Sequence, residues 1–118
     1  MKKLIWIIIL VLVVLGIMAL SGGDKTPVAS GPIKLGVITP LTGDAAALGE
    51  FIKNVIDLAV AEINEAGGIQ GEPIELVYED GKCSGAPSVS AAQKLISSDQ
   101  VKIIIGSECS GGVLAMLP

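Results

Sequence analysis

Short apolar runs alternate with amphipathic segments throughout residues 33–118, and few folds accommodate that alternation. Three of the runs have the length and the β-branched composition of buried strands. They are IKLGVI at 33–38, IELVYE at 74–79 and VKIII at 101–105. Helical spacing of apolar residues occurs over 45–66 and 87–98, and a third helix is expected to begin near Ser110. This order predicts an α/β domain of three layers, with helices covering a parallel, Rossmann-like sheet.

The segment 45–66 has the clearest helical periodicity. Its apolar residues recur on one expected face, which consists of Leu48, Phe51, Ile52, Val55, Ile56, Ala59 and Ile63. Gly67-Gly68 is expected to end this helix, because glycine adopts left-handed backbone without steric cost. In the shorter helix, 87–98, Pro87 suits the first turn. The residues expected on its inward face are Val89, Ala92 and Ile96.

An unbroken apolar run precedes this domain. Leu4–Leu20 contains a single glycine and follows Lys2 and Lys3, so we expect an N-terminal hydrophobic helix. Ala19 and Ser21 are the small residues that a signal peptidase requires. The run is also near the lower limit of about 17 residues for a membrane span, so an uncleaved anchor is the alternative. In either case the two lysines place the rest of the chain outside the cytoplasm.

The sequence therefore divides into three parts. Residues 1–21 are a signal peptide or membrane anchor. In residues 22–32 Gly, Ser, Pro, Thr and Asp together dominate without periodicity, which is typical of a flexible tether. Residues 33–118 form the folded domain.

Composition excludes several classes of function. The 118 residues include eight lysines, no arginine and no histidine, and the net charge is −4. A nucleic-acid surface needs a basic patch, so we expect no nucleic-acid partner. Histidine is the usual general base and zinc ligand, and neither a dinucleotide fingerprint nor a Walker motif is present. We therefore expect no enzymatic activity, no metal and no cofactor.

Ligands of parallel α/β sheets bind at the carboxyl ends of the strands, which here lead into the segments 39–48, 80–86 and 106–112. The last of these, GSECSGG, runs from a strand end into the start of a helix. The Ser110 hydroxyl and the N–H groups near Cys109 and Gly111 are candidates for binding a carboxylate or phosphate oxygen. The alternative is that Ser110 only caps the helix.

The two cysteines, Cys83 and Cys109, follow two different strands. A disulfide between them would close a loop of roughly 25 residues and contribute ~3–4 kcal/mol in the chain-entropy model. Two free thiols or a redox pair are the alternatives, and the spacing is not that of a C-x-x-C motif. If the strand order is second-first-third, their strands are roughly 10 Å apart. Both loops must then bend over the first strand for a bridge to form.

Three stretches carry a resemblance to a known family. They are IKLGVITPLTGDAAALG, DLAVAEINEAGGIQGEPIELVYEDGKC and VKIIIGSECSGGVLAMLP. In this order and spacing they resemble the beginning of the branched-chain amino-acid (Leu/Ile/Val) binding proteins of ABC transporters, which have the type I periplasmic binding protein fold. The resemblance implies that 33–118 is the first part of lobe 1 of a two-lobed protein, and that this chain is an N-terminal fragment.

The resemblance also implies roles for individual residues. It implies a disulfide between Cys83 and Cys109, and a Ser110 whose hydroxyl and amide bind the ligand α-carboxylate. Leu48 stands where members often have an aromatic residue against the ligand side chain. The run Tyr78–Asp80 is expected to be structural or to form the rim of the site.

The function that the resemblance implies is that of an extracytoplasmic solute-binding component. It would bind amino acids, branched-chain or related, for uptake, with the membrane permease of an ABC transporter as its partner. A membrane-tethered extracellular ligand-sensing domain is the alternative. A secreted enzyme with Glu79, Asp80 and Glu108 as reacting carboxylates is less favoured, because no base, metal cluster or cofactor motif accompanies these acids.

Overall fold

The computed structural model describes residues 31–117. Its elements are β1 (Ile33–Thr39), α2 (Ala46–Glu65), β2 (Ile74–Asp80), α3 (Gly85–Ser97), β3 (Ile103–Ile105) and α4 (Ser110–Met116). The predicted alternation of strands and helices is confirmed. The expected hydrophobic helix over 1–21 and all but the end of the expected tether lie outside the described residues. Among the helices described, none is long and apolar enough to cross a bilayer.

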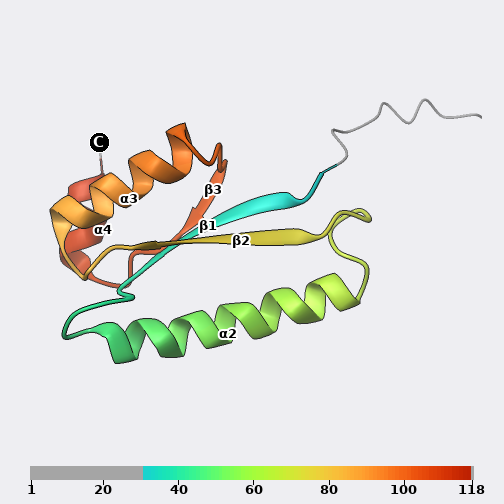
Figure 1. The fold of residues 1–118 in the computed structure, drawn as a ribbon, viewed down its shortest axis with the longest axis horizontal. Helices are drawn as coiled ribbons and strands as arrows, with labels where there is room; N and C mark the ends of the chain where they lie inside the picture. Colours follow the sequence, from blue (N-terminus) through green and yellow to red (C-terminus); the bar gives the residue numbers. More distant parts are fainter. Residues whose placement is uncertain (1–30, 118) are drawn as a thin grey trace, which may run out of the picture. The chain divides into compact units, whose positions relative to one another are not determined.

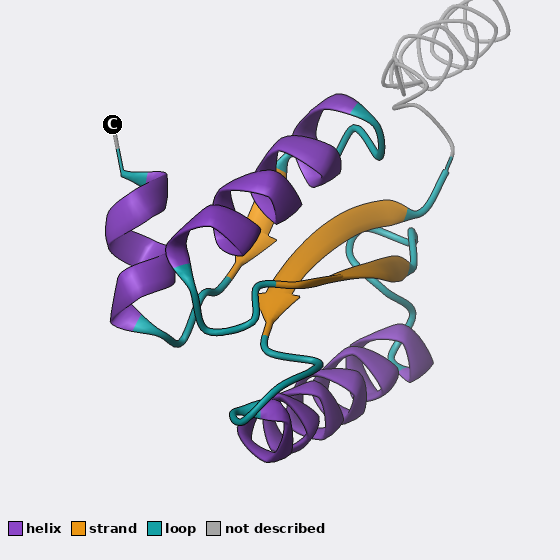
Figure 2. Ribbon diagram, turned by 60° about the vertical axis from the view of Figure 1, so that its left-hand side comes forward, coloured by secondary structure: helices purple, strands orange, loops and turns teal. Residues whose placement is uncertain are grey.

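The three strands form one parallel sheet in the order β2-β1-β3. Strand β1 is central, and its register with β2 runs from Ile33 opposite Ile74 to Thr39 opposite Asp80. Strand β3 pairs with the middle of β1, where Val37 is opposite Ile105. Helix α2 covers one face of the sheet, and α3 and α4 lie on the other (Figure 1, Figure 2). The three-layer α/β architecture is therefore as predicted.

The hydrophobic core lies between the sheet and α3. Ile38, Ala91, Leu95 and Val101 form its buried cluster. Gly36 on β1 permits the close approach of α3, because a Cβ there would lie 2.9 Å from a Leu95 methyl carbon. Val101 precedes β3 and donates its N–H to the Leu95 carbonyl at 2.9 Å, so α3 and β3 are joined at this point. Burial of such side chains is the main stabilising contribution to a domain of this size.

The inward face of α3 differs from the prediction. Its buried residues are Ser88, Ala91 and Leu95, whereas Ile96 is 59% exposed. The helix also begins at Gly85, two residues before the expected start. The cause is Ser88, a polar residue on the buried face, which a pattern of apolar residues does not identify. Its hydroxyl is buried because it donates a hydrogen bond to the Gly81 carbonyl at 3.3 Å.

The apolar stripe of α2 is wider than the surface that the sheet covers. Gly49 and Val60 are buried, but Phe51 is 66% exposed and Val55 is 52% exposed. Strand β3 is two residues shorter than predicted, and its Ile103 and Ile105 are exposed at the edge of the described sheet. The apolar pattern of these two segments is therefore wider than the surface that the described part of the chain buries.

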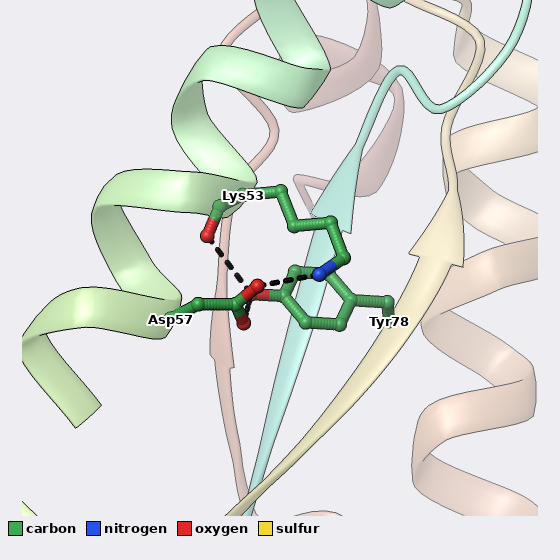
Figure 3. A network of polar contacts seen from close by, with 3 residues as sticks. All are labelled: Lys53, Asp57 and Tyr78. Atoms are coloured by element: carbon green, nitrogen blue, oxygen red, sulfur yellow. Dashed lines mark hydrogen bonds and ion pairs between the residues drawn. The ribbon is translucent and has the colours of Figure 1, made fainter. Parts of the chain in front are cut away.

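Polar contacts fix α2 against β2. The Asn64 side chain accepts the Ile74 N–H at 2.7 Å and donates to the Ile74 carbonyl at 2.9 Å, so it pairs with the start of the strand as a backbone would. Farther along, Asp57 accepts a 2.7 Å hydrogen bond from the Tyr78 hydroxyl and a 2.5 Å bond from Lys53 (Figure 3). The Lys53 ammonium also lies 4.8 Å from the centre of the Tyr78 ring.

Candidate functional site

The carboxyl ends of the three parallel strands lie at one edge of the sheet. We call the connections that leave it the rim loops: residues 40–45 after β1, 81–84 after β2 and 106–109 after β3. They lead into the starts of α2, α3 and α4, as Figure 2 shows. The segments that the sequence indicated as a site are therefore brought together.

Two of the rim loops are joined by a disulfide bond between Cys83 and Cys109, whose Cα atoms are 5.1 Å apart. Their strands are second neighbours across β1, so both loops have to cross its end. After β2, left-handed backbone at Lys82 (φ 48°) and Cys83 (φ 54°) redirects the chain. After β3, Gly106 has φ 114° and packs so closely on the Ile38 carbonyl of β1 that a Cβ would overlap it.

The start of α4 presents Ser110 and Gly111 to solvent. Their N–H groups belong to the first turn, where a helix supplies no carbonyl partner. The capping position belongs to Cys109, and Ser110 is the first helical residue, so the interpretation of Ser110 as a simple cap is not supported. The Cys109 N–H donates to the Ser107 hydroxyl at 3.3 Å. Ser110 and Gly111 are therefore the exposed donors among the predicted residues here.

Close packing beneath α4 fixes this turn. A Cβ at Gly112 would lie 2.6 Å from both the Ser107 and the Ser88 hydroxyl oxygens, so only glycine fits between α4 and these buried serines. At Gly85, the start of α3, a Cβ would lie 3.0 Å from the Ala115 methyl. Helix α4 is thus seated on the start of α3 and on the loop after β3, and sequence patterns gave no signal of either buried serine.

Leu48 lies in the first turn of α2 and is 47% exposed. Gly49 beside it packs directly on the Pro40 carbonyl, with no space for a Cβ. Helices α2 and α4 lie on opposite sides of the sheet (Figure 1), and Leu48 and Ser110 belong to the first turns of these two helices.

Asp80 connects the loops after β1 and β2. One carboxylate oxygen accepts the N–H groups of Leu41 and Lys82, each at 2.9 Å, and the other accepts the Thr42 hydroxyl at 2.5 Å. Partial burial acts to raise the pKa of Asp80, but these hydrogen bonds outweigh it and hold the pKa below its ordinary value. The prediction of a structural rim residue fits this role. The bond from Asp80 to the N–H two residues later is an Asx turn, which the sequence Asp-Gly-Lys does favour.

The three acids proposed for an enzyme do not act together. Asp80 is engaged with the rim loops, whereas Glu79, next to it on β2, forms an ion pair with Lys94 of α3. Consecutive strand residues point to opposite faces, so the two carboxylates are on different sides of the sheet. Glu108 is exposed. Within residues 31–117 no group of three potential ligands for a metal ion is found.

A parallel β2-β1-β3 sheet with helices on both sides is the architecture of an α/β lobe, and in such sheets ligands bind at the carboxyl edge, where the candidate groups lie. Comparison with protein families agrees: the family described as periplasmic binding protein matches residues 32–118. The chain belongs to this family.

Several relatives are named for branched-chain amino acids. A Leu/Ile/Val-binding protein homolog of Brucella abortus (strain 2308) is 47% identical over 79 residues, which cover 67% of this chain and 21% of the relative. A leucine-, isoleucine-, valine-, threonine- and alanine-binding protein of Pseudomonas aeruginosa is 33% identical over 93 residues, which cover 79% of this chain and 25% of the relative. The chain thus spans about a quarter of the length of these relatives.

Solved structures show the same fold. A branched-chain amino acid transporter substrate binding protein from Streptococcus pneumoniae, in complex with isoleucine, matches with a TM-score of 0.68 and 36% identity over 72% of this chain and 24% of that one. A solute binding protein from R. palustris in complex with benzoate matches with a TM-score of 0.65 and 31% identity, over 73% of this chain and 23% of that one.

Proposed function

We propose that this chain supplies part of the ligand site of an extracytoplasmic solute-binding component of an ABC transporter, which binds amino acids, branched-chain or related, for uptake. The observation that carries the proposal is the exposed pair Ser110 and Gly111 at the carboxyl edge of the sheet, in a chain of this family. The names of the relatives and the isoleucine in a similar structure support the ligand class.

In this proposal Ser110 binds a carboxylate of the ligand. Its hydroxyl and its N–H donate to one carboxylate oxygen, and the Gly111 N–H donates to the other. Hydrogen bonds to a charged group are about twice as strong as those between neutral groups. Cys109 contributes indirectly: its N–H donates to the Ser107 hydroxyl and its sulfur is in the disulfide, so it fixes the turn that carries Ser110. Leu48, on the other side of the edge, contacts the apolar part of the ligand.

A carboxylate is common to the amino acids and aromatic acids bound by similar structures. We therefore assign to this lobe the recognition of the acid group, which Ser110 performs for either class of ligand. The sequence contains no histidine and no cofactor motif, and we propose binding without chemical turnover. The membrane permease of the transporter is the proposed partner.

The domain organisation belongs to the same proposal. Residues 1–21 direct the chain out of the cytoplasm, as a signal peptide or as a membrane anchor, and residues 22–32 act as a tether. Residues 33–118 form the first part of lobe 1. The apolar run Leu4–Leu20, preceded by two lysines, supports export, and the Cys83–Cys109 disulfide suits an oxidising compartment.

Calorimetry with matched pairs of ligands tests the proposal. Isoleucine and isoleucinamide differ only in the carboxylate, as do benzoate and benzamide. We expect the acid of a pair to bind the full chain and its amide to bind at least about tenfold more weakly, since a lost charge-assisted hydrogen bond costs roughly 1.5–3 kcal/mol. Ser110→Ala should reduce that preference without abolishing it, because it removes the hydroxyl and keeps the N–H groups of residues 110 and 111. Ser90→Ala, at an exposed position on α3, is the control. Equal binding of acid and amide would refute the role of Ser110.

A further inference from the structure

One carboxylate holds two rim loops together. The side chain of Asp80 ends β2 and accepts hydrogen bonds from Leu41 and Thr42 in the loop after β1, and from Lys82 in its own loop. Thr39 is its partner in register, so Asp80 stands where both strands leave the sheet. Removing this carboxylate would leave these three donors without their acceptor. It would also remove the side-chain hydrogen bonds that join the loop after β1 to the loop after β2.

The Asp80 contact to Lys82 also supports the turn that carries Cys83. Lys82 and Cys83 both have left-handed backbone, which is unfavourable for residues with a Cβ. The hydrogen bond from the Lys82 N–H to Asp80 stabilises that conformation at its first residue. The turn directs Cys83 across the end of β1 to Cys109, which directly precedes Ser110. Asp80 is therefore connected to the start of α4 through the disulfide.

On its other side Asp80 is connected to the start of α2. Leu41 and Thr42, which it binds, follow Pro40, and the Pro40 carbonyl packs against Gly49 without space for a Cβ. A displacement of the loop at Leu41 thus shifts the surface on which the first turn of α2 rests. Leu48 is in that turn, next to Gly49.

We propose that Asp80 is a positioning residue for the ligand site: together with the Cys83–Cys109 bond it joins the three rim loops in series, so that Leu48 and Ser110 keep one arrangement before a ligand binds. The assignment of Leu48 and Ser110 to a ligand rests on the proposed function. The connection between the loops does not, because it follows from the hydrogen bonds, the disulfide and the close packing.

Hydrogen exchange of the full chain, followed by mass spectrometry, tests the connection without a ligand. In Asp80→Ala we expect exchange about tenfold or more faster both in 40–48, which Asp80 binds, and in 106–112, which it does not touch. Glu79→Ala is the matched control, because it removes the neighbouring carboxylate on the opposite face of β2, and both segments should keep their wild-type rates. Faster exchange in 40–48 alone would overturn the series connection, and no change in either would overturn the role of Asp80.

A milder variant covers the case in which Asp80→Ala unfolds. Thr42→Val removes only the hydroxyl partner of the carboxylate and keeps both backbone contacts. It should accelerate exchange in the same two segments by a smaller factor, whereas strand β1 keeps its protection. Uniformly faster exchange across β1 as well would indicate general destabilisation and overturn the positioning role.

Ligand affinity supplies the second readout, with isoleucine as the probe. We expect Asp80→Ala to weaken binding at least about tenfold, and Thr42→Val to have no further effect in the Asp80→Ala background, because both changes break the same contact. Additive effects would contradict the proposal. If the unaltered chain binds neither isoleucine nor benzoate, the proposed function fails, and the exchange pattern alone decides whether Asp80 connects the loops.

Discussion

The hydroxyl of Tyr78 on β2 donates a 2.7 Å hydrogen bond to the Asp57 carboxylate on α2, so the face of the sheet opposite α3 is joined to its helix by a polar contact as well as by apolar packing. Burial, followed by the hydrogen bond to Asp57, raises the pKa of Tyr78, which therefore stays protonated and remains a donor at neutral pH. The contact lies beside the ion pair of Asp57 with Lys53 (Figure 3).

Tyr78→Phe removes the donor of this hydrogen bond and should destabilise the folded chain by about 0.5–1.5 kcal/mol, the usual net contribution of one hydrogen bond. Asp57 keeps its contact with Lys53 in this variant, so the loss stays modest. Urea unfolding followed by circular dichroism measures it as a lower midpoint with an unchanged slope. A midpoint equal to that of the wild type would mean that water replaces Asp57 without cost.

Because of Asp57, the folded chain is expected to lose stability as the pH falls. The hydrogen bond from Lys53, and then that from Tyr78, hold the pKa of Asp57 below its ordinary value of 3.8. A carboxyl with a lowered pKa contributes stability that is present above its unfolded pKa and is lost as the pH falls through its folded pKa. We expect the melting temperature of Asp57→Asn to fall less than that of the wild type from about pH 6 to about pH 3. Parallel curves for the two proteins would contradict this assignment.

The disulfide should contribute a large part of the stability. Cys83 and Cys109 are 26 residues apart, and closing a loop of this size contributes ~3–4 kcal/mol in the chain-entropy model. The double variant Cys83→Ser/Cys109→Ser should therefore unfold at a clearly lower urea concentration, and reductant should produce the same shift in the wild type. Reductant should leave the double variant unchanged, which controls for other effects of the reagent. Equal midpoints with and without the bond would exclude a stabilising role.

Gly49→Ala should move the start of α2. A methyl group there overlaps the Pro40 carbonyl, and overpacking of this kind costs typically about 1–3 kcal/mol. Elsewhere in a helix the same change is stabilising, because alanine is the better helix former. Glu50→Ala, one residue later and exposed, is the matched control and should be near neutral. A Gly49→Ala protein that is more stable than the wild type would contradict this prediction, because it would mean that the loop after β1 moves away from the methyl group without loss of stability.

Periodicity and turn residues were enough to predict the fold. The bounds of β1 and α2 agree with the prediction within one residue, because each is a long pattern bounded by proline or glycine. The predicted inward face of α3 differs from the observed one by one position, because hydropathy places serine on the solvent side. Ser88 is buried through one hydrogen bond to Gly81, a contact 7 residues earlier in the chain. Local patterns do not contain such pairings.

The candidate site shows the same limit. Ser110 was indicated by the local sequence, since a serine between a strand end and two glycines marks the start of a helix. The connection of two rim loops by the Asp80 carboxylate depends on the register that places Thr39 opposite Asp80. It also depends on a hydrogen bond from Leu41, 39 residues away, and no local sequence pattern predicts either contact. The packing of Gly112 against Ser88 and Ser107 likewise requires two helices and a loop to meet. Candidate residues within one local segment were therefore predictable, whereas hydrogen bonds and close packing between distant segments were not. The Cys83–Cys109 pair is the exception, and its prediction came from the resemblance to the family.

The Cys83–Cys109 bond also ties the covalent connection of two rim loops to the redox state of the compartment. The cytosol keeps thiols reduced, so in a chain exported as proposed the bond forms only after translocation. Until then the turn at Lys82 and Cys83 and the start of α4 are not covalently joined. A newly made chain would therefore pass through the cytosol without the covalent link between two of its rim loops, and this link would form only in the oxidising compartment outside.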